Sequence, residues 1–377
     1  MAAEPKVPSQ SKAMRTFLDV LLNESAWRAI AVQLAAVLLA LIIGAILLLI
    51  SGANPIEAYG ALLRGSFGSM TALGRTLEKA TPMIFAGLSV AFAFKAGLFN
   101  IGAQGQLLFG AIVAAFLGFA IHGLPAVIHM PLALIGGALA GGLYGVIPGV
   151  LKAYRGAHEV ITTIMLNYIA INMTDLLADG PWKDISPGNV VARTPPIEAS
   201  AAIGELGKIP IGFFIAIVVA VVVWWLLWKT TTGFEIRMVG LNPSAARYAG
   251  IKVARTVVLT MVIAAILAGI GGAVETLGVV GRYQPGFNTG LGFDGITIAM
   301  LAKTHPFGTI PAAVLVGAMK AGAGEMQFAS GVAKEITDVI QALILFFVAA
   351  DVIVRTLLRM RETGGEEIKL STGWGKQ

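Results

Sequence analysis

The chain has 377 residues, of which 56% are hydrophobic and only 13% charged. A soluble domain carries about 25% charged residues, so this composition excludes an ordinary soluble protein and predicts a polytopic, all-α membrane protein. The absence of cysteine excludes disulfides, thiolate metal sites and cysteine nucleophiles. The net charge of +6 could indicate a nucleic-acid partner, but the distribution of the charges along the chain argues against one.

The membrane-spanning segments follow from the apolar runs. The first apolar run has about 24 residues and follows 26 polar residues. A cleavable signal peptide has a shorter basic segment and a shorter apolar segment, so we expect this first span to stay in the protein. Runs of about 20 residues predict about ten spans, the eighth short and weak, at 27–50, 76–97, 101–121, 130–151, 160–178, 210–228, 256–279, 291–304, 307–324 and 337–355.

The basic residues set the orientation. With the N-terminus in the cytoplasm, the 27 Lys and Arg residues divide into 18 on the inner side and 9 on the outer side, as the positive-inside rule requires. This predicts a cytoplasmic segment at 1–26, a membrane domain at 27–355 and a cytoplasmic tail at 356–377. The domain includes an outer loop at 179–209 and a cytoplasmic loop at 229–255.

Two predicted outer segments have distinct sequence signals. Residues 54–64 begin with an Asn cap followed by Pro55, which predicts a short interfacial helix. The 179–209 loop contains four prolines, which preclude a long regular helix. Each segment is a solvated connection or a docking surface for an external partner.

Two glycine-rich breaks interrupt the predicted spans. Residues 94–106 place three glycines and amide side chains where the second and third spans meet, and residues 290–295 form a similar break. A break of this kind lets a membrane helix unwind and present backbone groups to a polar solute. A simple tight turn explains each break equally well.

A glycine ridge runs through the fourth span. Gly137, Gly141, Gly145 and Gly149 recur every four residues and therefore share one helix face. Small residues at this spacing let helix backbones approach closely in lipid. We expect close helix packing here, either within one chain or between two chains.

Five polar residues are predicted at membrane depth: Asn100, Gln104, Asn167, Glu275 and Asp294. Such residues often mark a transport pathway, although Asn167 and Gln104 are equally well explained as interhelical hydrogen-bond partners. We expect Glu275 and Asp294 near the outer ends of their helices, solvated or ion-paired. No dense file of carboxylates is present, which weakens the case for a proton pump.

A short polar helix is predicted at 240–251, between the sixth and seventh spans. Asn242 suits the cap position, Pro243 the first helical position, and Gly250 the left-handed residue after the last turn. The roughly seven helical residues span about 10 Å, too little to cross a bilayer. Because this helix carries Arg247 among other basic residues, we expect it on the cytoplasmic side, exposed to water, where a partner protein can bind it.

The sequence contains no sign of catalysis. The four histidines are scattered, and none belongs to an H-E-x-x-H pair. No phosphate-binding loop occurs, because the nearest candidate, 204–208, has the wrong spacing. We therefore expect a chain that is not an enzyme and does not hydrolyse ATP.

The chain resembles the permease subunits of bacterial ABC importers in the branched-chain amino acid, ribose and nucleoside group, above all the nucleoside (simple-sugar) branch. Four segments carry the resemblance: KAGLFNIGAQGQ (95–106), EVITTIMLNYI (159–169), GLNPSAARYAGI (240–251) and GLGFDGITIA (290–299). It extends over about residues 30–360. Gln104 departs from the pattern, since relatives commonly carry Glu there, which puts solute selectivity in doubt.

The resemblance implies an assembly in the bacterial cytoplasmic membrane. Two permeases would pair around a translocation path, with two cytoplasmic ATPases below and an extracytoplasmic solute-binding protein above. The second permease would be a related but different chain. The partner ATPase would use ATP, and this chain would bind no cofactor or metal itself.

The resemblance also suggests functional residues. The ATPase contact is expected at the helix 243–249, through Asn242, Pro243, Ala245, Ala246, Arg247 and Gly250. For a nucleoside, which needs apolar surface for the base and amide or hydroxyl groups for the ribose, the candidate pathway residues are Phe99, Asn100, Gln104, Asn167, Phe293 and Asp294.

Three other functions stay open at this stage. An ABC permease for ribose, another simple sugar or branched-chain amino acids shares the same motifs. An ion-coupled secondary carrier is weakened by the few mid-membrane carboxylates. A membrane-embedded enzyme would need a clustered catalytic set that the sequence does not provide.

Overall fold

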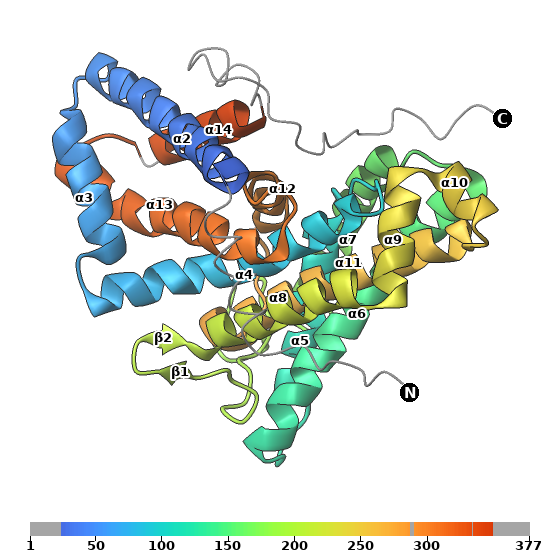
Figure 1. Ribbon diagram of the computed structural model, residues 1–377. Coiled ribbons are helices and arrows are strands. Elements are labelled where there is room, and N and C mark those ends of the chain that lie inside the picture. The colour runs from blue at the N-terminus through green and yellow to red at the C-terminus, as the bar shows by residue number, and fades with distance from the viewer. Residues whose placement is uncertain (1–23, 287–289, 334, 350–377) are drawn as a thin grey trace, which may run out of the picture.

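The computed structural model describes residues 24–286, 290–333 and 335–349, and these are almost entirely helical (Figure 1). The helices are α2 (Glu24–Ile50), α3 (Pro55–Phe67), α4 (Met70–Phe94), α5 (Ala103–Ala120), α6 (Ala126–Arg155), α7 (Glu159–Asp179), α8 (Ile211–Lys229), α9 (Thr231–Leu241), α10 (Pro243–Tyr248), α11 (Val253–Glu275), η1 (Thr276–Val280), α12 (Leu291–Leu301), η2 (Pro306–Gly308), α13 (Thr309–Ser330) and α14 (Glu335–Ala349).

Eight helices in the described residues are long and apolar enough to cross a membrane. They match eight of the predicted spans, and the other two correspond to the 11-residue α12 and to α14, which is described as far as Ala349. The polytopic all-α prediction is confirmed. The predicted segments 1–26 and 356–377 lie almost wholly outside the described residues.

The second span begins earlier than hydropathy places it. We predicted a start at residue 76, but α4 begins at Met70, where the Ser69 hydroxyl accepts a hydrogen bond from the backbone N–H of Ala72 at 3.1 Å. The apolar window misses this turn because it contains the charged Arg75. The cap, rather than hydropathy, fixes the start of this helix.

The segment after α2 forms the predicted short helix. In α3 the Asn54 side chain accepts a hydrogen bond from Ile56 N–H at 3.0 Å, and Pro55 occupies the first turn. The helix continues to Phe67, three residues beyond the expected end. It lies at the end of the molecule opposite α10 and connects α2 to α4 (Figure 1).

The core of the protein is α11, which packs against α4, α5 and α6. The glycine ridge of α6 faces it: a Cβ on Gly141 would lie 2.7 Å from the Cα of Gly269, and one on Gly145 would lie 2.2 Å from the Cβ of Ala265. Only hydrogen atoms fit at this separation, so the two backbones are in direct contact. The ridge therefore serves packing within the chain.

A second group of helices consists of α2, α3, α13 and α14 (Figure 1). In it α13 packs against α3 and α4, and α2 packs against α14. The Gln33 amide joins this group to α12 by donating to the carbonyl oxygen of Leu301 at 2.6 Å. This hydrogen bond places the end of α12 beside α2.

The loop between α7 and α8 contains no helix, as its prolines predicted, and only one small hairpin, β1 (Glu205–Leu206) with β2 (Ile209–Pro210). Backbone hydrogen bonds pin it along the end of α11: Thr194 N–H donates to Tyr283 O at 2.9 Å, and Ile203 N–H donates to Leu277 O at 2.8 Å. Inside the loop, hydrogen bonds from Ser186 lower the pKa of Asp184, and Arg193 assists. Hydrogen bonds therefore hold the loop in place over the end of α11.

Candidate functional site

The short polar helix predicted between the sixth and seventh spans is present as α10. The Asn242 side chain caps it by accepting from Ala245 N–H at 3.0 Å, and Gly250 has φ +86°, which closes the far end. Only Ala246 is buried, whereas Arg247 is exposed and Tyr248 is 95% exposed. The helix thus exposes one basic and one aromatic side chain.

Residues 230–252, which we call the coupling loop after the role predicted for α10, touch the first glycine-rich break directly. Gly240, at the end of α9, lies so close to the 95–97 turn that a Cβ on it would be 2.2 Å from the carbonyl oxygen of Lys95. The contact is backbone to backbone, because a Cβ on Gly97 would also approach Gly240 O, at 3.4 Å. The chain thus leads from α10 through α9 to a direct contact with the break.

Amide hydrogen bonds fix the break itself. Asn100 and Gln106 form a reciprocal amide pair, with N–O distances of 2.9 and 3.1 Å, and Asn100 also donates to the Ser89 hydroxyl at 3.1 Å. All three side chains are buried. The break is a folded turn whose polar groups are satisfied internally.

Two further amides connect the break to its neighbours. Asn167 of α7 accepts from Gly105 N–H at 2.9 Å and donates to Ile101 O at 2.9 Å. Gln104 accepts from the backbone N–H of Gly292 at 2.8 Å, which ties α12 to α5. Asn100, Gln104 and Asn167 are at most 3% exposed. The geometry thus favours interhelical hydrogen bonding, one of the two roles left open for Gln104 and Asn167.

The other predicted pathway residues lie nearer the surface. Phe99 is half-buried, with its ring 4.9 Å from that of Phe94 in an edge-to-face arrangement, and Phe293 is 45% exposed. Asp294 forms an ion pair with Lys320 at 2.6 Å and accepts from the Gln341 amide at 2.7 Å. This network joins α12, α13 and α14, and its basic partner was not anticipated.

Glu275 departs from the expectation that it would be solvated or ion-paired. It is only 5% exposed, at the junction of α11 and the π-helical turn η1, and forms no ion pair among the described residues. The prediction was wrong because the 181–210 loop covers this end of α11, with Ile203 hydrogen-bonded to η1.

The exposed face of α7 carries a surface patch that the sequence did not reveal. The patch consists of Tyr168, Ile169, Asn172, Met173 and Leu176, beside an open space of about 340 Å³. Tyr168 is 62% exposed, and the exposed Asn172 amide donates at 2.7 Å to the backbone oxygen of Tyr168 in its own helix. An exposed amide at membrane depth is costly in lipid, so this face suits a watery path or a protein partner.

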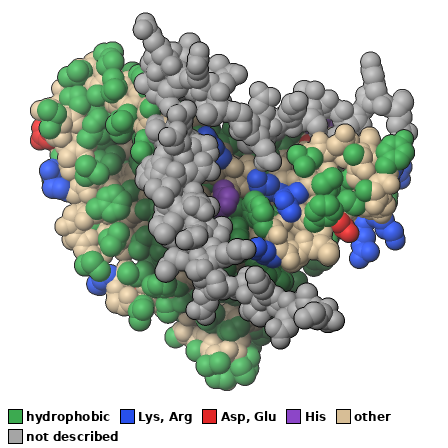
Figure 2. Space-filling model, viewed as in Figure 1, with side chains coloured by type: hydrophobic (Ala, Val, Ile, Leu, Met, Phe, Trp, Pro, Cys, Tyr) green, Lys and Arg blue, Asp and Glu red, His purple; other side chains and the backbone are tan. Residues whose placement is uncertain are grey.

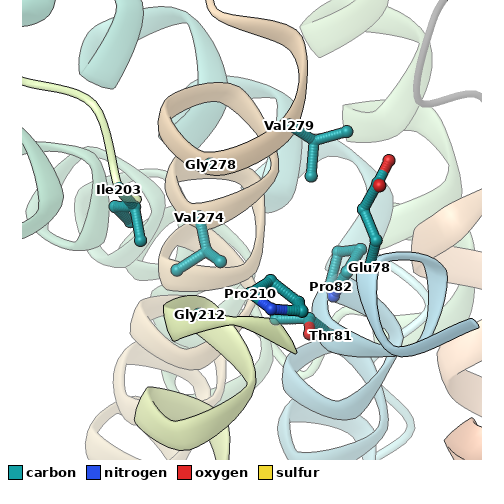
Figure 3. Close-up of a pocket in the computed structure, with 9 residues that line it drawn as sticks. All are labelled: Glu78, Thr81, Pro82, Ile203, Pro210, Gly212, Val274, Gly278 and Val279. Carbon is teal, nitrogen blue, oxygen red and sulfur yellow. The ribbon is translucent and has the colours of Figure 1, made fainter. Parts of the chain in front are cut away.

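A second cavity is too small for a solute. It has a volume of about 10 Å³, room for about one water molecule, between the middle of α4, the start of α8 and the end of α11 (Figure 3). Its lining is mostly apolar, and the Glu78 carboxylate points away from the space (Figure 3). This cavity is a packing defect rather than a binding site.

The sequence comparisons decide the family. The chain matches the family described as branched-chain amino acid transport system / permease component over residues 72–349. The chain belongs to this permease family. No solved structure matches it.

Relatives that align with this permease over most of their length are named as ABC transporter permeases. It is 42% identical to the guanosine ABC transporter permease protein NupP of Bacillus subtilis, over 87% of this chain and 95% of the relative. It is 38% identical to the nucleoside ABC transporter permease protein NupB of Lactococcus lactis, over 88% and 93% of the two chains. It is 32% identical to the glucose ABC transporter permease protein TsgB13 of Haloferax volcanii, over 88% and 90%.

The same comparisons find a second, more distant permease in each bacterium. NupQ of Bacillus subtilis and NupC of Lactococcus lactis are both 26% identical to this permease, over 64% and 63% of its length. This permease is a transport subunit of the ABC type. No group of His, Cys, Asp or Glu able to hold a metal ion is present in the described residues.

Proposed function

We propose that this permease carries nucleosides across the membrane as one half of an ATP-driven importer. The observation that supports this best is the 42% and 38% identity, over nearly the whole chain, to relatives named for guanosine and nucleosides. A simple sugar is the second candidate, because a relative named for glucose is 32% identical over a similar length.

The partner permease in this proposal is a different chain. Both NupP and NupB come from bacteria that have a second permease named for the same solute, and this chain is far more similar to the first of each pair. We therefore assign it the NupP-like half of a heterodimer. A solute-binding protein and cytoplasmic ATPases complete the assembly, with both termini of this chain in the cytoplasm.

The solute path in this proposal runs along the exposed face of α7, toward the start of α12. Tyr168 supplies an aromatic surface for a base, and Asn172 supplies an amide for ring or ribose polar groups. The two helices flank residues 101–105, where Asn167 and Gln104 hold them. Phe293, 45% exposed at the start of α12, is the third contact we assign to the path.

Coupling to the ATPase is assigned to α10. Its six residues are capped at both ends and mostly exposed, so the helix can dock as a rigid element. From there α9 reaches the 95–97 turn through Gly240. Nucleotide-driven closure of the ATPases would arrive at the path as a rigid-body shift.

The direct test is uptake by the complete transporter in cells that lack their own nucleoside uptake. Labelled guanosine and adenosine should accumulate, and a hundred-fold excess of uridine should compete more strongly than the same excess of glucose. Competition by glucose alone would replace the nucleoside assignment with the sugar one. Uptake by this chain alone, driven by an ion gradient, would reject the importer class.

The path assignment has its own test. Stacking of an aromatic side chain on a base contributes roughly 1–3 kcal/mol, so Tyr168→Ala should raise the KM for guanosine about five-fold or more. Leu143→Ala on α6 is the control, because Leu143 is 71% exposed and is not among the residues that line this face of α7. Equal effects of the two substitutions would place the path elsewhere and leave the nucleoside assignment standing.

A further inference from the structure

A belt of tryptophans ends α8, at the same end of the molecule as α10. Trp224, Trp225 and Trp228 are followed directly by Lys229, and α9 begins two residues later. Tryptophan is enriched at the level of lipid headgroups, where its ring is half in hydrocarbon and half in water. The end of α8 therefore marks the membrane–water interface on the side of the coupling loop.

Cations from three elements converge on this belt. The Lys95 ammonium lies 5.6 Å and the Arg237 guanidinium 6.0 Å from the ring centre of Trp228. Lys229 lies 5.6 Å from the ring centre of Trp224. We call Lys95, Lys229, Arg237, Trp224 and Trp228 the Trp228 cluster, and it joins the end of α4, the end of α8 and α9.

The positive charge available to a ligand comes from Arg237 and Lys229. The Nε atom of Arg237 is buried without a hydrogen-bond partner, and neither Arg237 nor Lys229 forms an ion pair among the described residues. His305 lies beside the cluster, with its ring centre 5.5 Å from that of Trp228, and burial, and next the charge of Lys95, lower its pKa. A guanidinium donor held out of water with no partner is costly and favours an anion.

The surroundings of the cluster are apolar on the membrane side. Val221 and Val222 precede it on α8 and are 44 and 52% exposed, and Trp225, between its two tryptophans, is 54% exposed. Figure 2 shows Lys and Arg side chains around a histidine on one face, with hydrophobic side chains beside them. A ligand here would have an anionic head at the cations and a hydrocarbon body along α8.

We propose that the Trp228 cluster binds the phosphate headgroup of an anionic phospholipid. Basic pockets between membrane helices select such headgroups, and the planar guanidinium of Arg237 suits a phosphate oxygen pair. The bound lipid connects α9 to α8 and to the 95–97 turn. It therefore steadies the coupling loop, independently of which solute the permease carries.

The test measures lipid binding to the purified full-length chain. Native mass spectrometry in detergent should show phosphatidylglycerol retained at lower concentration than phosphatidylcholine. Each basic residue near a membrane surface contributes an energy equivalent to about a five-fold change in affinity. Arg237→Gln should therefore weaken phosphatidylglycerol binding about five-fold, Arg237→Gln with Lys229→Gln about thirty-fold, and Arg237→Lys much less than Arg237→Gln.

The matched control is Arg155→Gln, which removes an exposed charge from the same end of the molecule, at the end of α6, away from the cluster. It should change the affinity less than two-fold, and each variant is checked for an unchanged melting temperature in phosphatidylcholine nanodiscs. An equal loss for Arg155→Gln, or equal retention of the two lipids, would overturn the proposal in favour of diffuse charge. Displacement of phosphatidylglycerol by millimolar inorganic phosphate would overturn it in favour of a soluble anion.

Discussion

Gly240→Ala should uncouple ATP hydrolysis from transport. The new Cβ would lie 2.2 Å from Lys95 O, 2.9 Å from Lys95 C and 3.0 Å from Ala96 C. All three atoms belong to the backbone, so no side chain can rotate away. Because ordinary van der Waals contact begins near 3.4 Å, α9 must move by about 1.2 Å from the 95–97 turn.

The magnitude follows from two opposing terms. Overpacking a tight contact costs about 1–3 kcal/mol, whereas Ala in place of Gly near a helix end recovers up to about 1 kcal/mol. A net penalty of about 1–2 kcal/mol, applied in every transport cycle that closes this contact, lowers uptake about five- to thirty-fold. Hydrolysis should change little, since α10 and its cap are untouched.

The assay is a paired measurement in proteoliposomes that contain the complete transporter. ATP hydrolysis and guanosine uptake are measured on the same preparation, and the ratio of solute moved to ATP consumed is compared with wild type. Gly324→Ala on α13 is the control, because its Cβ meets nothing within 4 Å. A wild-type ratio for Gly240→Ala would refute the relay, and so would an equal loss of both activities, which would indicate failed docking.

Three further changes test the helix, the ridge and the ion pair. Asn242→Ala removes the cap of α10, costs about 1 kcal/mol and should lower uptake about five-fold in the same assay, whereas an unaltered rate would show that docking alone orders the helix. Gly141→Ala places a Cβ 2.7 Å from Gly269 Cα and should destabilise the chain by about 1–3 kcal/mol, seen as a lower melting temperature in detergent. Lys320→Met should also lower the melting temperature, because it leaves Asp294 without its cation. Adding Asp294→Asn to this variant should restore part of the loss. Purely additive effects of the two substitutions would contradict the pairing.

The sequence was sufficient for the spans and for α10, because both depend on local rules. Hydrocarbon requires long apolar helices, and a six-residue helix needs an Asn cap and a terminal glycine, which Asn242 and Gly250 supply. Helix ends were less certain: Arg75 concealed the first turn of α4, since hydropathy does not register a serine cap.

The arrangement of the polar residues was not predictable from local patterns. Asp294 and Lys320 are 26 positions apart, and Asn167 reaches Ile101 across 66 positions, so neither pairing leaves a periodic signal. The face of α7 with Tyr168 and Asn172 was missed for a related reason. Exposure depends on which helices pack beside α7, and a nearly uniform apolar sequence does not reveal that.

In the proposed mechanism, the break at 94–106 connects an external energy source to the solute path. At one end its turn contacts α9, which leads to α10. At the other end Ile101 is bonded to α7, and Gln104 of the adjoining α5 is bonded to α12. In a continuous helix the backbone N–H and C=O groups bond to one another, so the helix would offer no such attachment points. We therefore propose that the interruption lets a shift of the coupling loop move two helices of the proposed path together.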